Sequence, residues 1–336
     1  MHTALCDDDY PRRCACGDDH SGSILQSSFK SPPLSPFGNY IRADWHLRPK
    51  YPRKPLVTCQ VANQALPDPS GAVRIPFTPS ASAIGGFALG ARLWALCFYL
   101  TTAVIGCGLF VVMIVLYPFV MVLDRKSRRI FHSINALWAN LTAQWFYKTE
   151  IYGLENLPGP GEPAVYVANH QSFLDIYTTF QLNRPFKFIS KSTIFLIPII
   201  GWAMYLTGHV PLKRMDNKSQ VECLRRCYEL LTERVPIFFF PEGTRSKDGK
   251  LGKFKKGAFT LAVKAKVPVI PITLIGTGEL MPSGKENTLR RGTVKMIVHP
   301  PIVGDDALEL CNQAREVIST TLLAHEALTL TEEIHS

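Results

Sequence analysis

The hydrophobic and polar positions divide the chain into three regions of different character. Residues 1–85 follow no hydrophobic period. Residues 93–123 contain no charged side chain. From residue 150 onward, short apolar runs alternate with stretches whose apolar residues recur at helical spacing. These patterns predict an irregular leader, then a long apolar helix, then a globular domain.

The globular region alternates between predicted strands and predicted helices. Apolar runs predict strands at residues 164–168, 186–190, 210–212, 237–240, 269–274 and 294–298. Helical periodicity predicts helices at residues 173–182, 218–233, 256–266 and 307–323. Near-continuous apolar strands between amphipathic helices are typical of a sheet that is covered on both faces. We therefore expect an α/β domain over residues 150–325, followed by a tail at residues 326–336.

The uncharged run 93–123 predicts a transmembrane helix. About 20 apolar residues span a bilayer core, and this run is longer than that. Trp94 and Tyr117 lie near its ends, where amphipathic rings favour the membrane interface. The basic residues that follow at 125–129 predict that the domain beyond lies on the cytoplasmic or stromal side. A buried core helix is the alternative, and the length of the run disfavours it.

Two further segments could contact lipid. Residues 125–149 predict an amphipathic helix, which could pack on the domain or lie on the membrane surface. Residues 192–208 contain no charge but include Pro198 and Gly201, so they are too interrupted for a comfortable span. They could form a loop packed on the core or a re-entrant or interfacial patch. The sequence leaves both choices open.

The leader has the composition of an organelle transit peptide. Between residues 20 and 83 it holds seven basic residues against two acidic ones, with frequent serine and proline. The first nineteen residues argue against this interpretation, because they contain five aspartates and only two arginines. A disordered tail without a targeting role is the alternative.

Composition narrows the class of partner. The net charge of +10 favours anionic partners such as phosphate, anionic lipid or an acidic protein. No pattern typical of RNA-binding proteins or zinc fingers occurs, so we expect no nucleic-acid partner. The nine cysteines show no disulfide framework, which indicates a reducing compartment. The sequence also lacks a nucleotide-binding P-loop, a Gly-x-Ser-x-Gly elbow and a metal-ligand cluster.

The first candidate site is residues 169–175, Asn-His-Gln-Ser-Phe-Leu-Asp, directly after a predicted strand. His170 is the side chain best suited to take a proton near neutral pH. Asp175 could fix its tautomer and stabilise the imidazolium. The alternative is a capping box formed by Ser172 and Asp175, in which the carboxylate serves the following helix.

The second candidate is residues 239–246, Phe-Phe-Pro-Glu-Gly-Thr-Arg-Ser, where a strand enters a turn. Gly243 lets the backbone approach a ligand closely. Arg245 offers a planar fork that suits a phosphate. Glu242 could accept a hydrogen bond from a hydroxyl or hold a basic neighbour. An ordinary polar turn with an internal Glu–Arg pair is the alternative.

Two weaker candidates follow. Lys213 and Arg214 end a predicted strand, and with the lysines at 247–256 they could form a basic mouth for an anionic head group. Solvated lysines are the alternative. The apolar, proline-containing run 267–272 could line a channel for an acyl chain, or it could be a core strand.

Taken in order, these four stretches resemble the four sequence blocks of the PlsC-type glycerolipid acyltransferases. The similarity is greatest to the plant-type plastidial 1-acyl-sn-glycerol-3-phosphate acyltransferases, and it covers residues 150–323. His209 departs from the pattern, because an aliphatic residue is expected there. The resemblance implies an α/β fold with a mixed central sheet flanked by helices, preceded by a transmembrane or membrane-embedded helix.

The resemblance also implies a reaction. An acyl group would pass from acyl carrier protein or coenzyme A to the sn-2 hydroxyl of lysophosphatidic acid, giving phosphatidic acid. His170 would act as general base and Asp175 would orient it, with no cofactor and no metal. The glycerol phosphate would be held by Glu242, Gly243, Thr244 and Arg245, with Lys213 or Arg214 adding charge, and Pro271 would shape the acyl site.

The location implied by the resemblance is a plastid (chloroplast) membrane, with the catalytic domain on the stromal side and membrane lipid as a partner. Acylation of the sn-1 hydroxyl of glycerol 3-phosphate is the nearest rival reaction. An acyl thioesterase and a non-catalytic lipid-binding membrane protein are the rivals from other classes. A phosphate-binding Arg245 favours the transferase, because a hydrolase needs no such contact.

Overall fold

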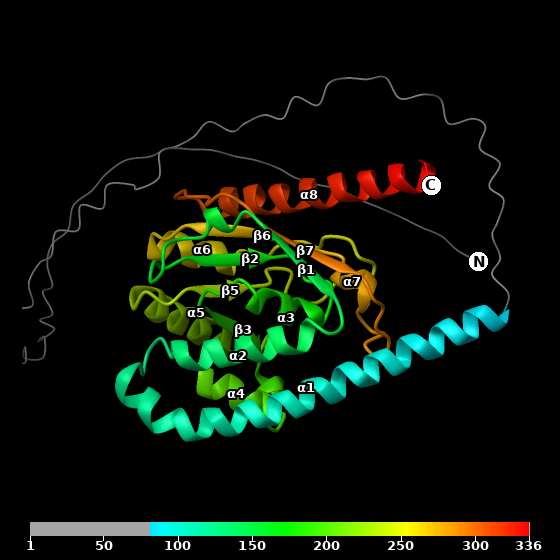
Figure 1. Cartoon of the computed structure of the whole chain (residues 1–336). Coiled ribbons are helices and arrows are strands. Elements are labelled where there is room, and N and C mark those ends of the chain that lie inside the picture. Colours follow the sequence, from blue (N-terminus) through cyan, green and yellow to red (C-terminus); the bar gives the residue numbers. More distant parts are fainter. Residues whose placement is uncertain (1–80, 336) are drawn as a thin grey trace, which may run out of the picture. The chain divides into compact units, whose positions relative to one another are not determined.

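The computed structural model describes residues 81–335, with side chains from residue 89 to residue 328 (Figure 1). The predicted leader lies outside the described residues except for its last five positions, which belong to helix α1. The elements, in chain order, are α1 (Ala81–Leu123), α2 (Arg129–Ala143), β1 (Lys148–Tyr152), η1 (Leu154–Asn156), β2 (Val165–Ala168), α3 (Leu174–Phe180), β3 (Lys187–Lys191), η2 (Ser192–Leu196), α4 (Ile200–Thr207), β4 (Val210–Leu212), α5 (Asn217–Thr232), β5 (Ile237–Phe239), α6 (Gly257–Ala265), β6 (Val269–Ile275), α7 (Thr277–Leu280), β7 (Thr293–Val298) and α8 (Ala307–His335).

The seven strands form one mixed sheet in the order β1-β7-β6-β2-β5-β3-β4. Every neighbouring pair is parallel except β6 and β7, which run antiparallel. The expected mixed sheet is therefore confirmed. Because β2, β3, β4 and β5 are parallel, their carboxyl ends meet at one edge of the sheet. The first three candidate stretches begin at the ends of β2, β5 and β4, so the topology gathers them at that edge.

Side chains of β2 alternate between two apolar cores, one on each face of the sheet. Tyr166 and Ala168 belong to the core that contains residues of α1, α2 and α3. Val165 and Val167 belong to the other core, which contains residues of α5, α6 and α8. Figure 1 shows α1 and α2 on one side of the sheet and α8 on the other. All four β2 residues are buried, which explains the unbroken apolar run in the sequence.

Some predicted boundaries differ from the structure. The predicted helix 125–149 is shorter, because α2 ends at Ala143 and Lys148 begins strand β1. Strand β1 lies at the edge of the sheet and mixes charged with apolar residues, so it gave no strand pattern. The predicted tail 326–336 is helical as far as His335, since no glycine or proline interrupts α8. Residues 192–208 fold as η2 and α4.

Helix α1 is long and largely apolar. The segment Leu89–Leu123 is long and apolar enough to cross a membrane, and most of it is exposed. Ala95 and Phe98 near one end, and Val120 near the other, are nevertheless buried against the domain. The helix therefore contacts the globular domain near both ends of its apolar segment and presents its remaining face outward.

Two basic side chains fix the α1–α2 connection to helix α4. Lys187 is buried, and its Nζ donates hydrogen bonds to the carbonyl groups of Ser127 at 2.5 Å and Thr207 at 2.6 Å. Arg128 Nη1 donates to the carbonyl groups of the two residues before Thr207, both at 2.9 Å. Positive charge at a helix carboxyl end is favourable, because the last carbonyl groups there lack partners within the helix.

Candidate active site

The turn that carries His170 leaves the end of β2 in the middle of the sheet. Asn169 fixes this turn to β6, because its side-chain amide donates to the Leu274 carbonyl group and accepts the Leu274 N–H, both at 2.8 Å. His170 is mostly buried, and its ring stacks on Phe240 with 4.0 Å between the centroids. The hydrogen bonds of the Asn169 side chain and the stacking on Phe240 thus hold the imidazole at the carboxyl edge of the sheet.

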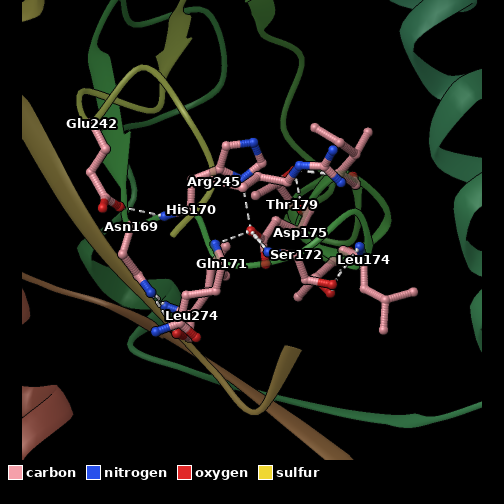
Figure 2. A network of polar contacts seen from close by, with 12 residues as sticks. Asn169, His170, Gln171, Ser172, Leu174, Asp175, Thr179, Glu242, Arg245 and Leu274 are labelled. Carbon is pink, nitrogen blue, oxygen red and sulfur yellow. Dashed lines mark hydrogen bonds and ion pairs between the residues drawn. The ribbon is translucent and has the colours of Figure 1, made fainter. Parts of the chain in front are cut away.

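His170 and Asp175 are in direct contact. Asp175 Oδ2 lies 2.7 Å from His170 Nδ1 (Figure 2). The same oxygen accepts the N–H groups of Gln171 at 2.7 Å and Ser172 at 2.8 Å. Since a carboxylate can only accept, Nδ1 carries the proton and Nε2 keeps its lone pair for a substrate. This is the arrangement required of a general base.

Asp175 combines the two roles that the sequence left open. It contacts the imidazole, and it also binds the Ser172 N–H in the manner of a capping box. The Ser172 hydroxyl oxygen accepts the Leu174 N–H at 3.2 Å, and its O–H donates to the Met281 carbonyl group at 2.7 Å. Asp175 is buried, and its Oδ1 atom has no hydrogen-bond partner among the described residues.

Glu242 joins the second motif to the first. Its Oε1 accepts the N–H of His170 at 2.7 Å, and its Oε2 accepts the N–H of Gly252 at 2.8 Å. Ser246 N–H donates to the His170 carbonyl group at 2.8 Å. Burial raises the pKa of the Glu242 carboxyl group, although its two backbone donors act in the opposite direction. In this structure, both carboxylate oxygens of Glu242 therefore bind the protein backbone.

The turn after Glu242 carries Arg245 and lies against the side chain of Lys255. Gly243 has a positive φ of 78°, and a Cβ atom there would lie 2.7 Å from Lys255 Nζ. Glycine adopts this conformation without strain and leaves room for the lysine. Arg245 Nη1 forms an ion pair with Glu286 at 2.9 Å, and both side chains are about one-third exposed. Thr244, between Gly243 and Arg245 in the chain, lines a cavity beside His170.

A cavity of about 1070 Å³ opens beside His170. Its basic part is lined by Arg214, Gly243, Arg245 and Lys255, among others. Its apolar part is lined by residues of α1, α2, η2 and α4, which include Tyr99, Gly106, Phe110, Trp138, Ile194 and Met204. The volume and the mixture of apolar wall and convergent polar groups are typical of a small-molecule site.

The structure does not bring all predicted site residues to this cavity. Lys213 is not among the lining residues, and its backbone N–H donates to the Ser219 hydroxyl. Pro271 is buried within β6 opposite Val167, and its carbonyl group accepts the N–H of His299. The sequence did not predict that α1 and α2 form walls of the cavity. The apolar stripe of residues 130–145 could have indicated the wall formed by α2.

His209, the departure from the family pattern, has a structural role. Its Nδ1 atom accepts the Phe188 N–H at 2.9 Å, and burial lowers its pKa well below the ordinary value. A neutral imidazole that accepts one backbone hydrogen bond therefore stands where an aliphatic side chain is expected.

Within residues 81–335, no group of three or more His, Cys, Asp or Glu side chains could hold a metal ion.

Comparison with known proteins gives consistent matches. The family model described as "Acyltransferase" matches residues 148–275. The chain is 56% identical over 234 residues to the chloroplastic 1-acyl-sn-glycerol-3-phosphate acyltransferase BAT2 of Brassica napus, covering 70% of this chain and 68% of that one. It is 49% identical over 278 residues to a 1-acyl-sn-glycerol-3-phosphate acyltransferase of Chlamydomonas reinhardtii, covering 82% and 80% of the two chains.

A solved structure also matches. The crystal structure of the 1-acyl-sn-glycerophosphate (LPA) acyltransferase PlsC from Thermotoga maritima superposes with a TM-score of 0.62 at 30% sequence identity. The match covers 71% of this chain and 97% of that one. The fold expected from the sequence is thereby confirmed.

Proposed function

The chain belongs to the 1-acyl-sn-glycerol-3-phosphate acyltransferase family, and on this premise we propose that it acylates the sn-2 hydroxyl of lysophosphatidic acid to give phosphatidic acid. One observation carries the proposal. The His170–Asp175 contact of 2.7 Å is joined through Glu242 to the turn that presents Arg245. A base and a phosphate-suited cation thus line one cavity.

In the proposed reaction, His170 Nε2 takes the proton of the sn-2 hydroxyl as its oxygen attacks the carbonyl carbon of the acyl thioester. The new carbon–oxygen bond forms, the carbon–sulfur bond breaks, and the thiolate receives the proton from the imidazolium. Asp175 holds the tautomer and stabilises the imidazolium. General-base catalysis contributes about 10²–10⁴-fold, and positioning of both substrates adds to it.

The acceptor phosphate is proposed to lie at the basic part of the cavity. Arg245 supplies N–H donors in a planar fork, Gly243 gives close access to the turn backbone, and Arg214 adds positive charge. We also propose a contact of Thr244 with the glycerol phosphate. Glu242 acts here by fixing the turn, because both its oxygens already bind backbone N–H groups.

The acyl donor is proposed to be the thioester of acyl carrier protein or of coenzyme A. Five basic residues line the cavity: Lys191, Arg214, Arg245, Lys247 and Lys255. Their combined positive charge exceeds the negative charge of one phosphate group. Both donors are anionic, so this charge suits either one. The net charge of +10 favours the acidic carrier protein. Rates of acyl transfer measured with each thioester at the same concentration distinguish these alternatives.

We propose that the protein acts at a plastid membrane. The chloroplastic relative supports the organelle. The exposed apolar face of α1 supports membrane association, and the packing of both its ends on the domain favours an embedded helix over a free-standing span. Location of the domain on the stromal side stays a prediction.

An assay with labelled acyl thioester, with and without lysophosphatidic acid, tests the function. We expect label in phosphatidic acid and little free fatty acid when the acceptor is absent. Acyl release that does not depend on the acceptor would identify a thioesterase instead. Faster acylation of glycerol 3-phosphate in the same assay would favour the sn-1 reaction.

A further inference from the structure

The loop of residues 281–292 connects α7 to β7 and contacts both helix α1 and the turn that carries His170. It carries Glu286, the ion-pair partner of Arg245. Its contacts show that the position of Arg245 depends on more than its own turn.

The Glu286 carboxylate is held within its own loop. Its Oε1 atom accepts the Gly284 N–H at 3.1 Å and contacts Arg245 Nη1 at 2.9 Å. A guanidinium group has five N–H donors in one plane. An anion fixed at one nitrogen orients that plane and leaves Nε and Nη2 of Arg245 for a second anion.

The loop is in turn fixed by helix α1. Tyr99 Oη donates to the Glu286 carbonyl group at 2.9 Å, and Leu289 N–H donates to the carbonyl group of Ala91 at 3.0 Å. The guanidinium carbon of Arg291 lies 4.3 Å from the centre of the Trp94 ring. These contacts tie the loop to the first half of α1.

The other end of the loop is tied to the catalytic turn. Ser172 lies two residues after His170 in the chain. Its hydroxyl donates to the Met281 carbonyl group at 2.7 Å. The loop therefore bridges the membrane helix, the histidine turn and Arg245. Glu286 has little freedom to move away when a phosphate arrives.

Charge in the cavity is consistent with a positioning role. Arg245 and Glu286 together carry no net charge, so attraction of a dianionic phosphate falls to the other cations of the cavity wall. Arg214, Lys247 and Lys255 line the same cavity. Arg245 can then supply directed hydrogen bonds while its neighbours supply charge.

We propose that Glu286 is a positioning residue that orients Arg245 for the acceptor phosphate, and that Tyr99 of α1 holds Glu286 in place. This inference rests on the proposed function. It assigns a part of the acceptor specificity to the contact between the loop and the membrane helix.

The test compares wild type with Glu286→Gln in the purified full-length enzyme in mixed micelles. The amide keeps the size of the side chain and removes its charge. We expect the KM for lysophosphatidic acid to rise about tenfold, with kcat and the donor KM within about twofold. Tyr99→Phe, which removes one hydroxyl, should raise the acceptor KM in the same direction but less.

A phosphate-free acceptor separates positioning from general damage. With 1-monoacylglycerol, Glu286→Gln should match wild type, because Arg245 has no phosphate to bind. Glu222→Gln, which breaks an exposed ion pair with Arg225 on α5, is the matched control. It should leave KM and kcat unchanged with both acceptors. Equal losses on both acceptors would overturn the proposal.

Three further outcomes are decisive. A lower or unchanged KM for lysophosphatidic acid in Glu286→Gln would overturn the proposal, a lower one by showing that the carboxylate competes with the phosphate. If Glu286→Gln does not fold, an unchanged acceptor KM in Tyr99→Phe would overturn it in the same way. Failure of wild type to use lysophosphatidic acid would instead refute the proposed function itself.

Discussion

Asp175 Oδ2 lies 2.7 Å from His170 Nδ1, and the same oxygen binds the backbone N–H groups of Gln171 and Ser172. One buried oxygen atom therefore sets both the shape of the turn and the tautomer of the imidazole. The capping and orienting roles of Asp175 are thus two consequences of one geometry, and mutations can separate them.

Asp175→Asn should lower kcat by roughly 10²–10⁴-fold with the acceptor KM within about threefold. The amide keeps an acceptor for the backbone donors but loses the charge that stabilises the imidazolium. Its NH₂ group would also be buried where Oδ1 has no partner, so the melting temperature should fall as well. Steady-state kinetics and melting in detergent measure both effects.

Ser172→Ala is the control for the structural part of this effect. It removes the hydroxyl contacts to Leu174 and Met281 without touching the contact between His170 and Asp175. We expect a lower melting temperature and a kcat close to that of wild type. A loss of kcat as large as that of Asp175→Asn would contradict the orienting role.

Arg245→Ala should raise the acceptor KM by about 10–100-fold, because charge-assisted hydrogen bonds to phosphate contribute roughly 1.5–3 kcal/mol. The ion pair with Glu286 is one-third exposed, so its loss should destabilise the fold by less than about 1 kcal/mol. Arg225→Ala, which breaks exposed ion pairs on α5, is the matched control. An acceptor KM that stays at the wild-type value would remove Arg245 from the phosphate site.

Glu242→Gln should affect stability as well as catalysis. One glutamine oxygen can replace one carboxylate oxygen, but the NH₂ group would face a second backbone N–H, at His170 or Gly252. An unpaired buried donor costs about 1–3 kcal/mol. Thermal melting and kinetics should therefore show a lower melting temperature together with a raised acceptor KM. A variant with normal stability and a changed acceptor KM alone would point to direct substrate contact.

The sequence predicted the sheet and the positions of the candidate stretches well, because buried parallel strands give unbroken apolar runs. It placed the strands at 164–168 and 237–240 within about one residue of β2 and β5. These two strands lie side by side and are parallel, which brings His170 and Glu242 together. The order of the strands, however, depends on long-range pairing that no local pattern reports.

Other features could not be read from the sequence. Arg245 and Glu286 are forty-one residues apart, and neither side chain belongs to a periodic pattern. Tyr99 lies within an apolar run that reads as a membrane helix, yet its hydroxyl binds the loop of Glu286. Such contacts arise only when separate elements pack, so their residues look like ordinary surface or membrane positions.

The exposed face of α1 predicts a specific membrane test. Val111 and Val115 lie one turn apart and are both more than half exposed. A lysine in the hydrocarbon region costs about 2.5–3.5 kcal/mol, so Val111→Lys combined with Val115→Lys should move the protein from the membrane fraction to the soluble one. Deletion of residues 93–123 is a poorer test, because Phe98 belongs to the core.

The control for this test is Val221→Lys, a similarly exposed valine on α5. It should leave fractionation unchanged, and all variants should melt at the wild-type temperature in detergent. Retention of the double variant in the membrane fraction would show that α1 is not the main anchor, or that α2 or the η2–α4 segment suffices.

Lys187 predicts a pH dependence of stability. Burial is the main cause that lowers its pKa from 10.5 to about 7, with Arg128 adding to the effect and Asp124 opposing it. Between pH 7 and 10.5 the unfolded chain keeps a proton that the folded protein has released. Since the unfolded state binds more protons there, stability contributed by this group rises with pH above about 7. Below pH 7 both states hold the proton, and the buried charge is fully unfavourable.

Lys187→Met removes this titration and leaves the carbonyl groups of Ser127 and Thr207 without their donor. We expect a lower melting temperature above pH 7, because two backbone carbonyl groups lose their partner. The difference in the free energy of unfolding between wild type and variant should widen from pH 7 to 9, with a limiting slope of about 1.4 kcal/mol per pH unit. The neighbouring His132 has a pKa of about 3, so it stays neutral in this window. A gap that is constant or narrows with rising pH would show that Lys187 remains charged in the folded protein.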